Sequence, residues 1–171
     1  MDMWIWPAAA AAILILLDQG TKLLALEWLK PIENAVAVPG LLDLTFVENR
    51  GVAFGMFSGQ RWLILALTGA IVGVLVYYYK KLPAEKEYRW VRCALVMIVS
   101  GAVGNIIDRI FRGYVVDFFD FAFMDWYVFN VADIYVVLGV IWLMFLMLFV
   151  IKDEPAADPH AEPDGEKKKG D

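Results

Sequence analysis

The sequence predicts an all-α polytopic membrane protein with four transmembrane helices and a small extracytoplasmic β element. Three observations support this fold class. First, 61% of the 171 residues are hydrophobic, whereas a soluble domain has about 45–50% apolar residues. Second, four segments are apolar over about 20 residues, the length of helix that crosses a hydrocarbon core of about 30 Å. Third, aromatic residues gather near the ends of these segments, as in the interfacial belt of membrane proteins.

The four apolar segments are the expected spans, and they cover residues 7–26, 62–79, 91–111 and 129–151. The first span begins with a proline, which suits the first turn of a helix. A run of alanines precedes the apolar core of this span, whereas the small residues of a cleavage site would follow it. We therefore expect the first span to remain uncleaved.

Basic residues predict the orientation of the spans, because cytoplasmic loops carry an excess of Lys and Arg. The loop between the third and fourth spans holds only Arg112. The loop between the second and third spans holds five basic residues: Lys80, Lys81, Lys86, Arg89 and Arg92. We therefore expect that loop in the cytoplasm, and with four spans both termini are expected there too.

Two connections are then expected to face outward. In the first, a run of apolar, aromatic and β-branched residues at 41–47 predicts a strand, and Asn49–Gly51 predicts a turn. We expect residues 31–60 to form a β cradle on the membrane surface. The second connection, residues 112–128, is short and aromatic. Residues 1–152 are thus expected to form one membrane domain.

Scarce residue types limit the possible chemistry. Cys93 is the only cysteine, and His160 is the only histidine. These counts argue against a disulfide, a metal site built on Cys or His, and a Ser–His or Cys–His catalytic pair in the spans. We therefore expect no metal and no cofactor. Residues 153–171 are charged and rich in proline, which predicts a disordered cytoplasmic tail without a catalytic role.

Ionisable residues inside the spans point to a site, because each costs about 2.5–3.5 kcal/mol at the centre of a membrane helix unless it is paired. With the predicted orientation, all of them lie in the outer half of the membrane. Random tolerance of polar residues would scatter them over all depths. The five residues are Asp18, Lys22, Asp108, Arg109 and Asp133.

Helical spacing groups the polar residues on common faces. Asp18 and Lys22 are four residues apart with the acid first, which favours an intrahelical ion pair with a structural role. On the third span, one face carries Asn105, Asp108 and Arg109. On the fourth span, one face carries Asn130 and Asp133.

The residues alone leave several roles open. Asp108 and Arg109 are most simply explained as ties between helices and the outer loop, and Asp120 and Asp125 as solvated loop acids. For Asp117 and Asp133, structural and catalytic roles are equally compatible with the sequence. Two carboxyl groups at one interface can share a proton, since like charge raises one pKa and leaves one acid and one base at neutral pH.

Taken in order, the motifs resemble the lipoprotein signal peptidase family, the bacterial type II signal peptidases. One departure is Ser100, where the family usually has the first of two glycines; this exchanges one small residue for another. The resemblance covers nearly the whole chain before the tail. The five motifs are Asp18–Lys22, Asn49–Gly55, Gly101–Arg109, Val115–Phe118 and Phe129–Asp133.

The resemblance implies an intramembrane aspartic endopeptidase of the bacterial inner membrane with its active site near the outer leaflet. Such enzymes remove signal peptides from prolipoproteins and cleave before the diacylglyceryl-modified cysteine. It implies that Asp117 and Asp133 activate water as a general acid/base pair and that the cradle covers the substrate. Site-shaping or substrate-binding roles fall on Asn49, Asn105, Arg109 and Asn130, and structural roles on Asp18, Lys22 and Asp108. The expected partners are the prolipoprotein and membrane lipid, with no nucleic acid, and the enzyme is expected to be a monomer.

Two other classes of function remain open at this point. A small transporter or channel could use the acids as a proton relay, but relay acids should span the depth of the membrane and inverted repeats are absent from the sequence. A non-catalytic assembly factor with a structural polar cluster would retain its function after both aspartates were replaced.

Overall fold

The computed structural model describes residues 5–52, 56–83 and 85–151. The predicted tail, residues 153–171, and the end of the second motif, Ala53–Gly55, lie outside these residues.

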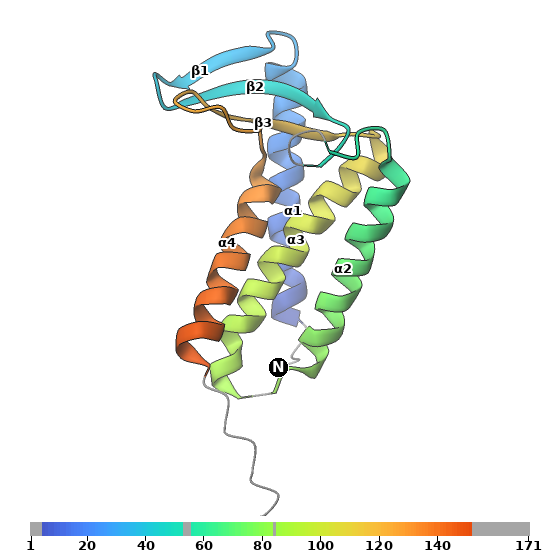
Figure 1. Cartoon of the computed structure of the whole chain (residues 1–171), viewed down its shortest axis with the longest axis vertical. Helices are drawn as coiled ribbons and strands as arrows, with labels where there is room; N and C mark the ends of the chain where they lie inside the picture. Colours follow the sequence, from blue (N-terminus) through green and yellow to red (C-terminus); the bar gives the residue numbers. More distant parts are fainter. Residues whose placement is uncertain (1–4, 53–55, 84, 152–171) are drawn as a thin grey trace, which may run out of the picture.

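Four long helices form a bundle (Figure 1). They are α1 (Ile5–Leu24), α2 (Arg61–Lys81), α3 (Arg89–Phe111) and α4 (Val131–Phe145). A π-helical turn prolongs α1 as η1 (Ala25–Leu29) and α4 as η4 (Leu146–Val150), and a short 3₁₀ turn, η3 (Lys86–Tyr88), precedes α3. All four helices, with η1 counted as part of α1 and η4 as part of α4, are long and apolar enough to cross a membrane. The predicted fold class is therefore confirmed, and the protein is a multi-pass membrane protein.

Helix α3 is the centre of the bundle and contacts α1, α2 and α4. Half of its apolar stretch is buried, against less than a fifth in each of the other helices. Two glycines allow α3 and α4 to pack closely: a Cβ on Gly101 would overlap the Ala132 carbonyl oxygen, and one on Gly139 would come within 2.7 Å of Ile98. In lipid the hydrophobic effect does not drive helices together. Small residues let the helix backbones approach closely, and van der Waals packing then holds the helices together.

An antiparallel sheet covers one end of the bundle and projects past α4 (Figure 1). We call this end of the bundle the sheet end and the opposite end the far end. The strands are β1 (Asn34–Val38), β2 (Leu42–Asn49) and β3 (Val115–Phe121), in the order β1-β2-β3.

The predicted cradle accounts for only two of the three strands. The strand expected at 41–47 is β2, and β1 pairs with it inside the predicted cradle. The third strand comes from the connection 112–128, where no strand was expected. Gly113, with φ at +86°, lies between α3 and β3, in a conformation that glycine adopts without strain. Asp117 therefore lies on a strand, opposite Val47 of β2.

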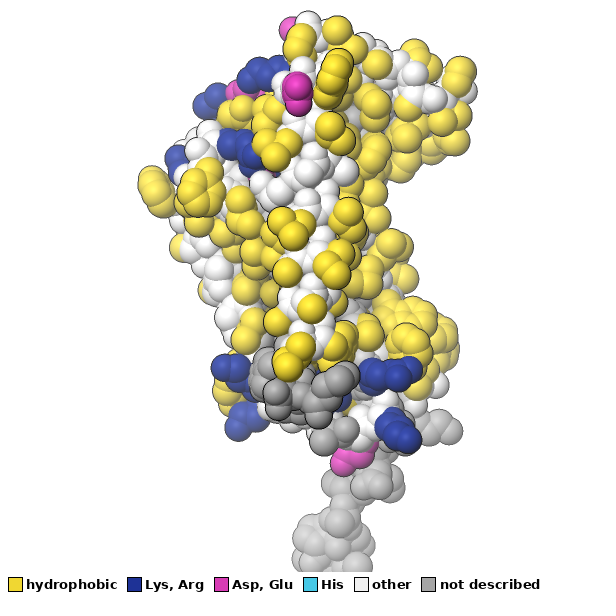
Figure 2. All heavy atoms as spheres, turned by 180° about the vertical axis from the view of Figure 1, so that it is seen from behind, with side chains coloured by type: hydrophobic (Ala, Val, Ile, Leu, Met, Phe, Trp, Pro, Cys, Tyr) yellow, Lys and Arg dark blue, Asp and Glu magenta, His cyan; other side chains and the backbone are white. Residues whose placement is uncertain are grey.

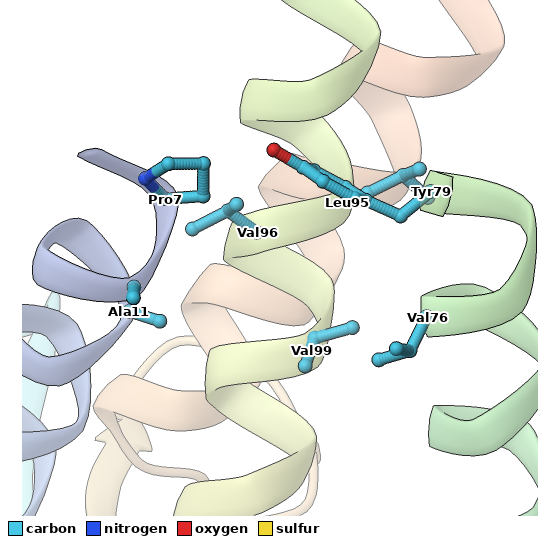
Figure 3. Close-up of a pocket in the computed structure, with 8 residues that line it drawn as sticks. Pro7, Ala11, Val76, Tyr79, Leu95, Val96 and Val99 are labelled. Carbon is cyan, nitrogen blue, oxygen red and sulfur yellow. The ribbon is translucent and has the colours of Figure 1, made fainter. Parts of the chain in front are cut away.

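The core of the far end is apolar apart from Arg92, which is buried and donates to the carbonyls of Leu82 and Pro83. Its buried cluster is formed by Tyr79, Val91, Leu95, Val96 and Leu146. An apolar cavity of about 240 Å³ lies there between α1, α2 and α3 (Figure 3), and no acid lines it. On the outside, hydrophobic side chains cover the helices and Lys and Arg gather near their two ends (Figure 2), as expected for a protein surrounded by lipid.

Candidate active site

Asp117 is a buried carboxyl group that two amides hold in place. It is 1% exposed in β3. The Nδ2 group of Asn49 donates to Asp117 Oδ2 at 2.8 Å, and that of Asn130 donates to Oδ1 at 2.6 Å. Burial, together with the negative charge of Asp133, raises the pKa of Asp117 to about 7, although the two amide hydrogen bonds oppose that shift. A carboxyl group in this position keeps its proton close to neutral pH.

Asp133 lies in the first turn of α4, where a capping box fixes it. Asn130 Oδ1 accepts from the Asp133 backbone N–H, and Asp133 Oδ2 accepts from the Asn130 backbone N–H, each at 3.1 Å. Asn105 Nδ2 donates to the other carboxyl oxygen at 2.8 Å. The N-terminal turn of a helix also favours a negative charge. Asn130, which is fully buried, thus bonds to both predicted catalytic aspartates.

Behind this pair lies an ion network that is completely buried. Lys22 Nζ contacts Asp18 Oδ2 at 2.9 Å and Asp108 Oδ2 at 3.1 Å, and all three side chains have no exposed surface. The predicted intrahelical ion pair is therefore present, with Asp108 as a second partner. Lys22 Nζ also donates to Asn105 Oδ1 at 2.9 Å, so one amide joins the network to Asp133.

The two acids of the network also hold the backbone beside the predicted catalytic aspartates. Asp18 Oδ1 accepts from the N–H of Ala132 at 3.0 Å, next to Asp133. Asp108 Oδ2 accepts from the N–H of Val116 at 3.1 Å, next to Asp117. Because Lys22 bonds to both acids, one cation links the backbone on either side of the candidate site.

Two further members of this network, Gln19 and Arg112, were not predicted from the sequence. Gln19 Nε2 donates to Asp18 Oδ2 at 3.1 Å and to Asp108 Oδ1 at 3.2 Å. Arg112 forms an ion pair with Asp108 and donates to Gln19 Oε1 at 3.0 Å. Signals for both were available: Gln19 is part of the first motif, and Arg112 follows Asp108 by one helical turn.

The structure brings together all nine residues singled out by the sequence. Arg109 ties α3 to the segment after β2, because its Nη2 group donates to the Gly51 carbonyl at 2.8 Å. The other two acids of the connection 112–128, Asp120 and Asp125, lie apart from this cluster. Asp120 is a strand residue that accepts from Thr45 Oγ1 at 2.9 Å, so its interpretation as a solvated loop acid was wrong. Asp125 is exposed, as expected.

The arrangement can support acid–base chemistry at one end of the bundle. One carboxyl group keeps its proton near neutral pH, a second lies at a helix N-terminus, and amides fix both. Among the described residues, no group of three His, Cys, Asp or Glu side chains could hold a metal ion. Two cavities open on the pair, of about 320 Å³ beside Asp117 and about 360 Å³ beside Asp133.

Comparison with known proteins decides between the classes of function left open by the sequence. The family model described as signal peptidase (SPase) II matches residues 10–149. The chain belongs to this family. The protein is therefore a peptidase, and the transporter and assembly-factor alternatives lose their support.

Curated relatives agree with this family, and a solved structure of a bacterial membrane enzyme is similar in fold. The chain is 45% identical over 138 residues to a lipoprotein signal peptidase of Caldanaerobacter subterraneus subsp. tengcongensis, covering 81% of this chain and 92% of the relative. It is 42% identical over 147 residues to a lipoprotein signal peptidase of Clostridium acetobutylicum, covering 84% and 92%. A bacterial membrane enzyme solved by the in meso method at 2.3 Å resolution superposes with a TM-score of 0.76 at 29% identity, covering 85% of this chain and 89% of that one.

Proposed function

We propose that this protein is an aspartic endopeptidase that removes signal peptides from prolipoproteins and cleaves before the diacylglyceryl-modified cysteine. Family membership supports the removal of signal peptides from prolipoproteins. The observation that supports the aspartic mechanism is the bridge through Asn130, which bonds to a carboxyl group of raised pKa on one side and to a second carboxyl group on the other.

In this mechanism Asp133 is the base and Asp117 is the acid. Asp133 takes a proton from water, and the water oxygen bonds to the scissile carbonyl carbon. Asp117 gives its proton to the carbonyl oxygen. As the C–N bond breaks, Asp133 gives the proton that it took from water to the leaving nitrogen, and Asp117 takes its proton back as the C=O bond re-forms. The position of Asp133 at a helix N-terminus and the raised pKa of Asp117 favour this assignment over the reverse. The two groups titrate as a coupled pair.

Asn49, Asn105 and Asn130 act as positioning residues in this scheme, since each donates to an oxygen of one aspartate. Arg109 shapes the site through Gly51. Asp18, Lys22 and Asp108 hold the surrounding backbone.

The proposed arrangement in the membrane follows from charge. The basic residues Lys80, Lys81 and Arg89 lie at the far end, which supports a cytoplasmic location for that end and for both termini. The sheet end, with its two aspartates, then lies near the outer leaflet of the bacterial inner membrane. Residues 1–152 form the peptidase domain in this proposal, and residues 153–171 form a cytoplasmic tail.

The function is tested with purified protein and a prolipoprotein prepared with and without the diacylglyceryl group. We expect cleavage immediately before the modified cysteine, detected as a mass change, and little cleavage of the unmodified form. Failure to cleave the modified form, or cleavage at another bond, would contradict the proposal.

A further inference from the structure

Two cavities that differ in the polarity of their lining open on the two aspartates. The more polar of the two, of about 320 Å³ and called the polar cavity below, is lined by Asp117, by Glu48, Asn49, Arg50 and Ser58, and also by Val47 and Val128. The apolar cavity, of about 360 Å³, is lined by Asp133 and by Phe121, Trp126, Phe129, Val137 and Leu138. Tyr127 lines both.

We propose that these cavities sort the two chemically different parts of the substrate at the scissile bond. The apolar cavity receives acyl chains of the thioether-linked diacylglyceryl group, and the polar cavity receives the adjoining peptide chain. This inference rests on the proposed function and adds to it which surface recognises the lipid.

The position of the apolar cavity suits a lipid chain. Its lower wall is formed by Val137 and Leu138, which belong to the membrane-spanning part of α4 and are 48% and 50% exposed. A chain in the membrane can therefore reach the cavity sideways without crossing water. The upper wall is aromatic, with the rings of Phe121 and Phe129 5.0 Å apart. In Figure 2 the surface is hollowed below the overhanging sheet, to which Phe121 belongs.

Binding of an acyl chain in this cavity orients the substrate for cleavage. A chain that leaves lipid for an apolar cavity exchanges one apolar environment for another, so burial alone contributes little. A chain held against α4 instead fixes the modified cysteine beside Asp133, which lies one helical turn from Val137. Small errors in the placement of reacting groups are costly to the rate.

The polar cavity suits peptide and does not suit lipid. An acyl chain there would remove water from the charged groups of Glu48 and Arg50, which are 30% and 63% exposed, and this is unfavourable. A peptide has a backbone N–H and C=O at nearly every residue and needs such partners. Arg109 supports this wall by bonding to the Gly51 carbonyl.

An apolar side chain of the signal peptide is the competing occupant of the cavity beside Asp133. The two occupants predict different responses when the cavity is filled. If acyl chains bind there, filling it weakens the preference for long chains over short ones. If a peptide side chain binds there, filling it weakens the preference for a large apolar side chain over alanine and leaves the chain-length preference unchanged.

The experiment measures kcat/KM for two prolipoproteins of identical sequence, one carrying dipalmitoyl and one carrying dibutanoyl glyceryl groups. Val137→Trp fills the cavity. Val74→Trp is the matched control, because Val74 is 54% exposed on α2, on the opposite side of α3 from α4 (Figure 1). We expect the long-chain preference of the wild type to fall roughly tenfold in Val137→Trp, the scale of discrimination by a hydrophobic pocket, and to persist in Val74→Trp.

Each preference is a ratio of two rates from one preparation, so partial unfolding does not alter it. Leu138→Trp serves as a second filling variant. An unchanged long-chain preference in both filling variants would overturn this inference while leaving the proposed function intact. A wild-type protein that cleaves neither substrate would instead contradict the proposed function itself.

Discussion

At the sheet end of the bundle, helices α1, α3 and α4 meet through buried charged and amide side chains, whereas at the far end they meet through apolar side chains. Lys22 with its two acids represents the first kind of contact, and Leu95 with Val96 represents the second. Removal of one apolar group costs in proportion to its size. Removal of one member of a buried ion network leaves an uncompensated charge. The sheet end should therefore respond steeply to single substitutions, and it is the end that holds the candidate site.

The largest expected effect at the sheet end is on catalysis. We expect Asp117→Asn and Asp133→Asn each to reduce kcat/KM by at least about a thousandfold, because general acid–base groups contribute up to about 10⁴-fold. Asp120→Asn, on the same strand but away from the site, should retain most of the activity. Thermal unfolding of the same samples shows whether they are folded. Substantial turnover by both folded single variants would refute the assignment.

The next largest expected effect is on the free energy of unfolding. It is measured by replacing two lysines, one buried and one exposed. Lys22→Met leaves Asp18 and Asp108 buried without their shared cation, at an expected cost of about 3–5 kcal/mol. Lys30 forms an exposed ion pair with Glu48 at 2.9 Å, and Lys30→Met should leave the unfolding midpoint nearly unchanged. Chemical denaturation in detergent micelles measures both. Equal midpoints for the two variants would show that burial of the network has no energetic consequence.

A smaller effect concerns the space around the network. A Cβ at Gly104 would lie 2.5 Å from Asp18 Oδ2, so Gly104→Ala should destabilise the protein by about 1–3 kcal/mol. Gly20 has no atom within 4 Å of the corresponding position and lies in α1. Gly20→Ala should therefore stabilise the helix by about 0.8–1 kcal/mol. Unfolding midpoints that move in opposite directions support this packing, and a shift in the same direction for both variants contradicts it.

The spans were predictable because the thickness of a membrane fixes the length of an apolar helix. The convergence of Asp18, Asp108 and Asp133 at one end was also predictable, since the topology assigns each residue a depth. Strand β3 was missed because Asp117 and Asp120 interrupt its apolar residues, so no regular alternation marks it.

Contacts between side chains could not be predicted from spacing alone. The roles of Gln19 and Arg112 depend on how α1 and α3 are rotated against each other, which the periodicity of each helix leaves undetermined. The bonds from Asp18 to Ala132 and from Asp108 to Val116 join segments far apart in sequence, and only the fold reveals them. They explain why residues expected to be structural lie next to the predicted catalytic pair.

The most direct test of this account is the pH dependence of kcat/KM for a substrate without titratable groups near the scissile bond. Asp117 must carry its proton to act as the acid, and its pKa is raised to about 7. The protonated fraction falls as pH rises through that value, so we predict a decline that approaches tenfold per pH unit above about pH 7. A rate that stays constant between about pH 6 and 9 would contradict the claim that a protonated Asp117 is required for catalysis.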